Sequence, residues 1–269
     1  MTFIYLLPAW LFLVALMVLF ALVACAGHVA VRRAFAGHDF REHNDVAGFV
    51  YAVIGVMYAV LLGFVVIVVW QQYNDSEERA TQEVFSTEFA FIAAGALPPP
   101  AGRDIRQALR GYVDAVIESE WPAMRHGGTS RDAERELDRA LASALQRVPR
   151  PAPNDAGPVV VAALRDVTQA RRHRLDDNIT GLPWLLWVAL WIGAVVIVAF
   201  SYLFGLPDIR VQLLMTAAMA ILIATLFAVI AQFDYPFRGD ISVSDDRWIT
   251  LRKGLPPAAA THPAQAGQR

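Results

Sequence analysis

The stretch "AGFVYAVIGVMYAVLLGF", residues 47–64, carries no charge and repeats small residues at steps of three or four. These small residues are Gly48, Ala52, Gly55, Ala59 and Gly63. Such steps place residues on one side of an α-helix, so one side of this helix is nearly bare. In lipid, small residues let helix backbones approach closely, and this packing is a main source of helix association. The stretch therefore predicts a membrane helix with a face for close packing.

The composition of the whole chain also indicates a membrane protein. Of its 269 residues, 56% are hydrophobic and 18% are charged, and the mean hydropathy is +0.41. A helix needs roughly 20 apolar residues to cross a hydrocarbon core of about 30 Å. Four segments meet this requirement, at residues 3–30, 46–70, 182–206 and 211–233. No strongly basic domain is present, so nucleic acid is not expected as a partner.

A polar insert separates the second and third apolar segments. The second helix is expected to continue past Trp70 until the prolines at 98–100 stop it, with an apolar side formed by Ala80, Val84, Phe85, Phe89 and Ile92. Apolar periodicity predicts further helices around residues 105–121, 137–148 and 158–177. We therefore expect an all-α membrane protein with four transmembrane helices and a helical insert. The expected parts are transmembrane helices 1 and 2 at 1–70, an insert at 71–181, transmembrane helices 3 and 4 at 182–233, and a C-terminal tail at 234–269.

The distribution of arginines predicts the orientation in the membrane. More basic residues flank the insert and the tail than flank the loops on the other side, so the insert and both termini are expected in the cytoplasm of a bacterial cell, with the chain multi-pass in its inner membrane. An alternative for the first segment is a lipoprotein signal that ends at Cys25. The absence of a basic region before this segment favours a membrane span.

No residue pattern in the chain is typical of an enzyme. Phosphate loops, dinucleotide fingerprints, zinc-protease helices and nucleophile elbows are all missing, so neither catalysis nor a cofactor is expected. One loop gathers potential metal ligands, namely His38, Asp39, Glu42, His43 and Asp45. A solvated loop followed by a helix start explains the same residues, and we therefore expect no metal site.

The bare face of the second helix has two interpretations. It packs against another helix, or it lies near the axis of an oligomer, where the stripe or the neighbouring Tyr51, Tyr58 and Phe64 border a conduit. Charged residues beyond the membrane would then line a vestibule: Glu77, Glu78 and Glu83 after the second span, and Arg171 and Arg172 before the third. Rings of glutamates favour cations and rings of arginines favour anions, so the selectivity stays open.

The fourth apolar segment leads into "FDYPFRGDISVS", residues 233–244. Pro236 cannot continue a helix, and Gly239 permits a turn. Phe237 is expected to dock against the membrane interface or the insert. This segment is therefore interpreted as a helix stop with a docked tail, or as a latch at the cytoplasmic mouth.

Three stretches resemble the bacterial bestrophin-like family: "AGFVYAVIGVMYAVLLGFVVIVVWQQYNDSEERATQEV" at 47–84, "LRGYVDAVIESEWPAM" at 109–124 and the segment at 233–244. The resemblance implies four membrane helices with a helical cytoplasmic part between the second and third. Bestrophins proper are oligomeric anion channels with a pore along the second span, although no stretch here matches their neck motif or calcium clasp. Our first hypothesis is a homo-oligomer in the lipid bilayer that conducts small inorganic ions. The alternative is a non-conducting scaffold whose insert binds a partner.

Overall fold

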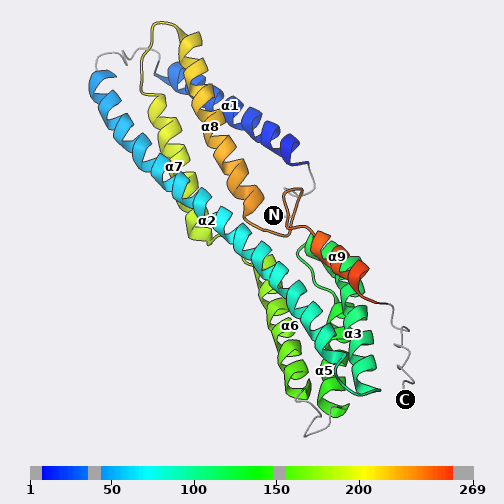
Figure 1. Cartoon of the computed structure of the whole chain (residues 1–269). Coiled ribbons are helices and arrows are strands. Elements are labelled where there is room, and N and C mark those ends of the chain that lie inside the picture. The colour runs from blue at the N-terminus through cyan, green and yellow to red at the C-terminus, as the bar shows by residue number, and fades with distance from the viewer. Residues whose placement is uncertain (1–7, 36–43, 148–155, 257–269) are drawn as a thin grey trace, which may run out of the picture. The chain divides into compact units, whose positions relative to one another are not determined.

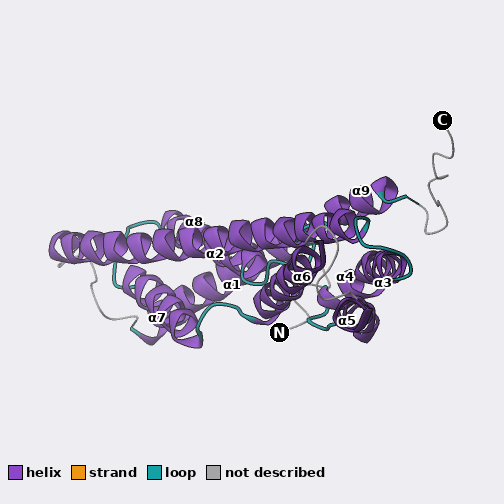
Figure 2. Ribbon diagram, turned by 60° about the horizontal axis from the view of Figure 1, so that its bottom comes forward, coloured by secondary structure: helices purple, strands orange, loops and turns teal. Residues whose placement is uncertain are grey.

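The computed structural model describes residues 8–35, 44–147 and 156–256, and this part of the chain is helical without strands (Figures 1 and 2). The chain divides into two compact units. One contains residues up to Asn74 together with Thr180–Ser242, and the other contains Asp75–Ile179 and the residues from Val243 onward. Each unit is described by itself below.

The first unit contains four long apolar helices and is the membrane unit. They are α1 (Ala9–Ala34), the first part of α2 (Asn44–Ala94), α7 (Trp184–Ser201) and α8 (Ile209–Phe233). All four are long and apolar enough to cross a membrane, which confirms the four predicted spans. In Figure 1, α1 and α8 lie side by side.

The core of the membrane unit forms where one side of α2 meets α7 and α8. Tyr58, Leu62, Val65 and Val69 of α2 pack there against Leu190, Ala194 and Ile197 of α7 and Ile223, Phe227 and Ile230 of α8. The Tyr58 hydroxyl donates a hydrogen bond to the Leu190 carbonyl at 2.9 Å. A Cβ added at Gly193 would lie 2.3 Å from the Tyr58 ring. The close contact of α2 with α7 in this unit therefore depends on a glycine of α7.

The second helix is unbroken over 51 residues, as predicted. At a rise of 1.5 Å per residue it is about 76 Å long, far more than one bilayer requires. It ends at Ala94, and the chain turns before the prolines at 98–100.

The second unit contains the remaining helices. These are the end of α2, α3 (Ala101–Ala115), η2 (Val116–Glu120), α4 (Trp121–Met124), α5 (Arg131–Arg147), α6 (Ala156–Ile179) and α9 (Asp246–Gly254). The amphipathic stripe predicted for α3 is buried, with Ile105, Leu109, Tyr112, Val113 and Val116 each fully inside. The helical character of the insert is confirmed, whereas the π-helical turn of η2 was not expected.

The prediction that Ala80, Val84, Phe85, Phe89 and Ile92 form one apolar side of α2 is wrong in part. Ala80 and Val84 are buried, but Phe85, Phe89 and Ile92 are 55%, 55% and 61% exposed. The opposite side of the helix faces inward and carries the fully buried Ser76, Glu83 and Thr87. The inward side also buries Ala90, Phe91 and Ala94, and the outward side carries Glu77, Glu78 and Glu88, which explains this orientation together with the polar contacts of Glu83 described below.

The segment after α8 forms the expected helix stop and turn. The helix ends at Phe233, three residues before Pro236, and Gly239 has a φ of 76°. Phe237 is 2% exposed and belongs to the membrane unit. The Asp234 carboxylate accepts a hydrogen bond from the Leu182 backbone N–H at 2.6 Å, which ties the end of α8 to the start of α7.

Candidate functional site

The tyrosines of the membrane part of α2 point into their own bundle. Tyr58 is 6% exposed and bonds to α7 as described above. Tyr51 stacks on Phe200 with ring centroids 5.7 Å apart, and its hydroxyl contacts the Met219 sulfur. Both tyrosines therefore hold α2 against α7 and α8 within one chain.

The small-residue stripe of α2 lies on a different side of the helix, where its glycines meet no other side chain of the part of the chain that the structure describes. A Cβ added at Gly48, Gly55 or Gly63 would meet nothing within 4 Å among the described residues. Ala52 and Ala59 are exposed. The structure thus separates two groups that the sequence analysis placed together, because the tyrosines lie inside the bundle and the small residues face outward.

A cluster of four charged side chains lies buried in the second unit. Arg174 of α6 donates to Glu83 of α2 through Nε to Oε2 at 2.5 Å and through Nη2 to Oε1 at 3.0 Å. The same Nη2 reaches Oε2 of Glu120, on η2, at 3.2 Å. Arg174, Glu83 and Glu120 are all 0% exposed. We call these three residues and Arg171 the ionic cluster.

Arg171 completes the ionic cluster from the same face of α6. Its Nη2 donates to Oε1 of Glu120 at 2.9 Å and to the Ser130 carbonyl at 3.3 Å. The cluster therefore contains two carboxylates and two guanidinium groups, and its formal charges balance. Balanced charges with satisfied hydrogen bonds are the condition under which ions tolerate burial.

Tyr112 of α3 adds a hydroxyl to the ionic cluster. This hydroxyl donates a hydrogen bond to Oε1 of Glu83. Burial, and then the negative charge of Glu83, raise the pKa of Tyr112 well above its usual value. Tyr112 thus remains a neutral donor over the whole physiological pH range.

The π-helical turn η2 lies where α3 would otherwise continue into α4. A π-turn adds one residue to a helical turn, and such turns occur frequently at functional sites. Glu120 is the last residue of this turn and points into the ionic cluster. The ionic cluster was not predicted, because Glu83 and Glu120 belong to charge runs that usually form solvated surfaces.

The charged residues expected along a vestibule fall into two sets. Glu77, Glu78 and Arg172 are exposed. Glu83 and Arg171 are buried in the ionic cluster, where Glu83 pairs with Arg174 and Arg171 pairs with Glu120. Only the first set is available to solvent in the described chain.

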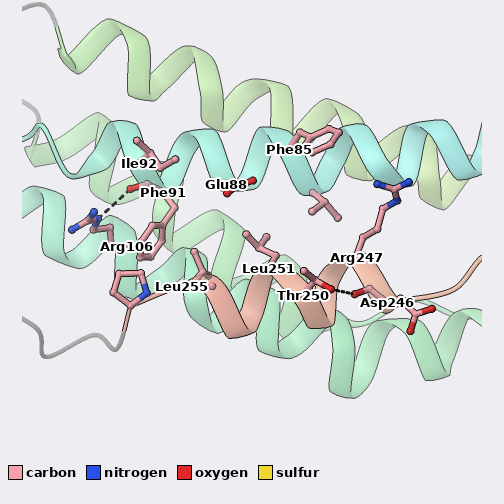
Figure 3. A pocket seen from close by; sticks show the side chains of 13 residues that line it. Phe85, Glu88, Phe91, Ile92, Arg106, Asp246, Arg247, Thr250, Leu251 and Leu255 are labelled. Carbon is pink, nitrogen blue, oxygen red and sulfur yellow. Dashed lines mark hydrogen bonds between the residues drawn. The ribbon is translucent and has the colours of Figure 1, made fainter.

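A groove of about 600 Å³ lies between α2 and α9 in the second unit (Figure 3). Its walls are mostly apolar and include Phe85, Ile92, Leu251 and Leu255. At one end Arg106 stacks over the Phe91 ring at 4.7 Å and donates to the Phe91 carbonyl at 3.1 Å. The groove is thus an amphipathic surface next to the exposed side of α2.

The residues described by the structure contain no group of three or more histidine, cysteine, aspartate or glutamate side chains that is able to hold a metal ion. The loop residues His38, Asp39, Glu42 and His43 lie outside the described part of the chain.

The sequence matches the family model of the bestrophin-like domain over residues 18–248. The chain belongs to the bestrophin-like family. Among curated proteins, no sequence matches this bestrophin-like chain.

Solved structures share the bestrophin-like fold. A bacterial bestrophin homologue from Klebsiella pneumoniae, phased with zinc, is 12% identical, with a TM-score of 0.66 over 94% of this chain and 99% of that chain. A mutant of a Klebsiella pneumoniae homologue is 11% identical, with a TM-score of 0.66 over 89% and 97%. A mutant described only as a membrane protein is 13% identical, with a TM-score of 0.68 over 92% and 100%. At such identities the likeness shows the fold and not the activity.

Proposed function

We propose that this multi-pass membrane protein assembles with copies of itself into a channel for small inorganic ions, with α2 next to the shared axis. The observation that carries the proposal is the small-residue stripe of α2, whose glycines have no neighbour among the described residues of their own chain. In lipid such a stripe favours close approach of another helix. A second copy supplies that helix, and membership of the bestrophin-like family supports the same arrangement.

Exposed apolar residues in the second unit also support self-assembly. Phe85, Phe89 and Ile92 recur on one side of α2 in a unit rich in charged residues. Large apolar patches on water-facing surfaces mark interaction sites. In the proposed oligomer a second copy covers them.

The proposed location is the bacterial inner membrane, with the insert and both termini in the cytoplasm. The distribution of arginines between the two sides supports this orientation. A cysteine placed at Gly128, in a Cys25→Ser background, is expected to resist labelling from outside intact cells. Labelling of that cysteine by an impermeant reagent would reverse the orientation.

The channel proposal is tested with two matched alanine substitutions. Ala59 on the stripe of α2 and Ala26 on α1 are both exposed in the chain. Ala59→Leu is expected to disrupt the oligomer and abolish the ionic current, because the larger side chain holds helices apart, whereas Ala26→Leu should change neither. Native mass and planar-bilayer currents measure the two properties, and reversal potentials identify the permeant ion. Wild-type protein that stays silent across voltage, calcium and pH would refute conduction.

The alternative function is a non-conducting scaffold whose insert binds a partner. The amphipathic groove between α2 and α9 favours it, because apolar walls with charged ends suit an extended or helical segment of another protein (Figure 3). An intact oligomer without conductance, together with binding that is lost on Leu251→Asp, would support the scaffold over the channel.

A further inference from the structure

An apolar groove of about 390 Å³ lies within the membrane unit. Side chains of α1 and α7 form its walls, and Ala220 of α8, which is 1% exposed, lies at its base. The groove is distinct from the small-residue stripe of α2, since its lining residues come from α1, α7 and α8. Its volume falls in the range of about 300–1,000 Å³ that is usual for ligand pockets. We call it the membrane groove.

The position of the membrane groove limits what can fill it. All three of its helices are long and apolar enough to cross a membrane, so lipid chains surround it in the bilayer. Leu19 and Val23 of α1 and Val195 of α7 line it and are exposed in the chain. A bound water needs two or more polar partners, which aliphatic walls do not provide. The occupant of the groove is therefore apolar along its length and comes from the membrane.

The membrane groove is about as long as one leaflet is thick. Along α7 it extends from Trp191 to Tyr202, which corresponds to about 16 Å at a rise of 1.5 Å per residue. A hydrocarbon core of about 30 Å contains two leaflets of about 15 Å each. A single acyl chain of a bilayer lipid therefore matches the groove in length and in polarity.

Aromatic side chains form both ends of the membrane groove. Near the middle of α7, the Trp191 ring lies 5.7 Å from the Phe20 ring and 5.0 Å from the Phe227 ring. At the other end Tyr202 lies against Gly27 of α1, where an added Cβ would be 2.6 Å from the Tyr202 hydroxyl oxygen. Tyr202 directly follows α7, at the depth of the membrane interface, where tyrosine rings are enriched. The groove thus extends from the interface toward the middle of the bilayer.

Basic residues gather at the interface end of the membrane groove. Arg32, in the last turn of α1, donates to the Phe204 carbonyl and ties α1 to the connection between α7 and α8. The neighbouring Arg33 and Arg210, at the start of α8, are exposed. The carboxylate of Asp208 accepts the Arg210 backbone N–H at 2.8 Å and caps α8. Guanidinium groups bind phosphate through strong charge-assisted hydrogen bonds, so this end suits a lipid phosphate.

We propose that the membrane groove binds one phospholipid, whose acyl chain lies between α1 and α7 and whose phosphate faces Arg33 and Arg210. Small side chains leave room for the chain, since Ala24, Ala194 and Ala220 line the groove and are each at most 4% exposed. The site is defined by contacts within the membrane unit and does not depend on whether the protein assembles or conducts ions.

A matched pair of substitutions on α7 tests the site in the full-length protein. Ala199 lines the membrane groove and Val196 is not among its lining residues, while both are exposed in the chain. Ala199→Phe places an aromatic ring in the groove near its interface end. Val196→Phe places the same ring on another side of α7 and is the control. Arg33→Gln combined with Arg210→Gln removes the basic charges and leaves the groove open.

Native mass spectrometry of delipidated protein, titrated with palmitoyl-oleoyl phosphatidylglycerol, measures the binding. The parent and Val196→Phe are expected to retain one lipid per chain, whereas Ala199→Phe and the double arginine variant should bind about tenfold more weakly or worse. Diacylglycerol with the same chains lacks the phosphate and should bind the parent as weakly as phosphatidylglycerol binds the double variant. Equal binding by Ala199→Phe and the parent would overturn the placement of the chain, and equal binding of the two lipids would overturn that of the phosphate.

Quenching of Trp191 locates the lipid without a blocking substitution. Its fluorescence is obtained as the difference between the parent and Trp191→Phe. Phosphatidylglycerol with bromine near the end of one chain should quench this signal at the concentration at which the first lipid binds, because Trp191 lies at the deep end of the membrane groove. An unquenched signal overturns the proposal. Binding by the monomer alone also overturns it, since a second copy would then fill the groove in the oligomer.

Discussion

Arg174 on α6 donates two hydrogen bonds to the carboxylate of Glu83 on α2, 91 positions earlier in the chain. Both side chains are completely buried. The substitution Arg174→Met removes one charge and leaves Glu83 without its main partner. We expect the second unit to lose about 3–5 kcal/mol of unfolding free energy, the usual cost of breaking a buried ion pair from one side. Denaturant titration in detergent measures the loss.

The exposed pair between the same helices provides the control. Arg79→Met breaks the ion pair with Asp177. Because solvent screens exposed charges, its expected cost is at most about 1 kcal/mol. Equal losses for the two arginines would contradict the importance assigned to the buried one.

We expect Tyr112 to make the free energy of unfolding depend on pH in the alkaline range. Its pKa is raised first by burial and then by the charge of Glu83. A folded pKa above the unfolded value of about 10 means that its contribution to stability is constant below that pH and is lost as the pH rises beyond it. Above about pH 10 the wild type should therefore lose up to about 1.4 kcal/mol per pH unit more than Tyr112→Phe. Parallel stability curves for the two proteins would show that Tyr112 ionises normally.

Gly193 of α7 lies against Tyr58, and we predict that a larger residue at this position causes a packing defect. A Cβ at Gly193 would lie 2.3 Å from two carbons of the Tyr58 ring, so Gly193→Ala should force α2 away from α7 and cost about 1–3 kcal/mol. The matched substitution Gly55→Ala has free space within one chain. It should not destabilise the monomer, because alanine favours a helix more than glycine does, and any loss should appear in the mass of the oligomer. Thermal unfolding in detergent and native mass separate the two effects.

We predict a second packing defect for substitution of Gly181, which lies in the turn before α7. A Cβ at Gly181 would lie 2.8 Å from the Tyr235 ring and 3.0 Å from Oδ1 of Asp234. Gly181→Ala should therefore weaken the bond from Leu182 to Asp234 and destabilise the membrane unit by about 1–3 kcal/mol. Gly254→Ala, at the end of α9 with open space around it, is the control. A loss of stability in both variants would point to a backbone effect and not to contact with Tyr235.

The elements that could be predicted from sequence are those that depend on local pattern. Uninterrupted apolar runs predicted the four spans, and helical periodicity up to the triple proline predicted the continuous helix α2. The stop at Pro236 and the turn at Gly239 follow from the backbone chemistry of those residues.

The parts that escaped prediction depend on partners far apart in the chain. Glu83 lies in a charge run that predicts a solvated surface. Only the fold brings Arg174 to it, and the same arginine also bonds Glu120. The contact of Gly193 with Tyr58 joins two helices that are distant in sequence. The inward side of α2 in the second unit was not predicted, because both sides of the helix mix apolar and polar residues and the contacts of Glu83 come from helices distant in sequence.

The unbroken length of α2 limits how this protein can change during evolution. Inserting or deleting one residue near Asn74 would turn every later position of the helix by about 100° and move it by 1.5 Å. Changes of seven or eleven residues nearly restore the original azimuth, since these lengths are close to whole numbers of turns. Homologous chains should therefore vary in length at loops and termini, while the middle of this helix tolerates substitutions but almost no gaps.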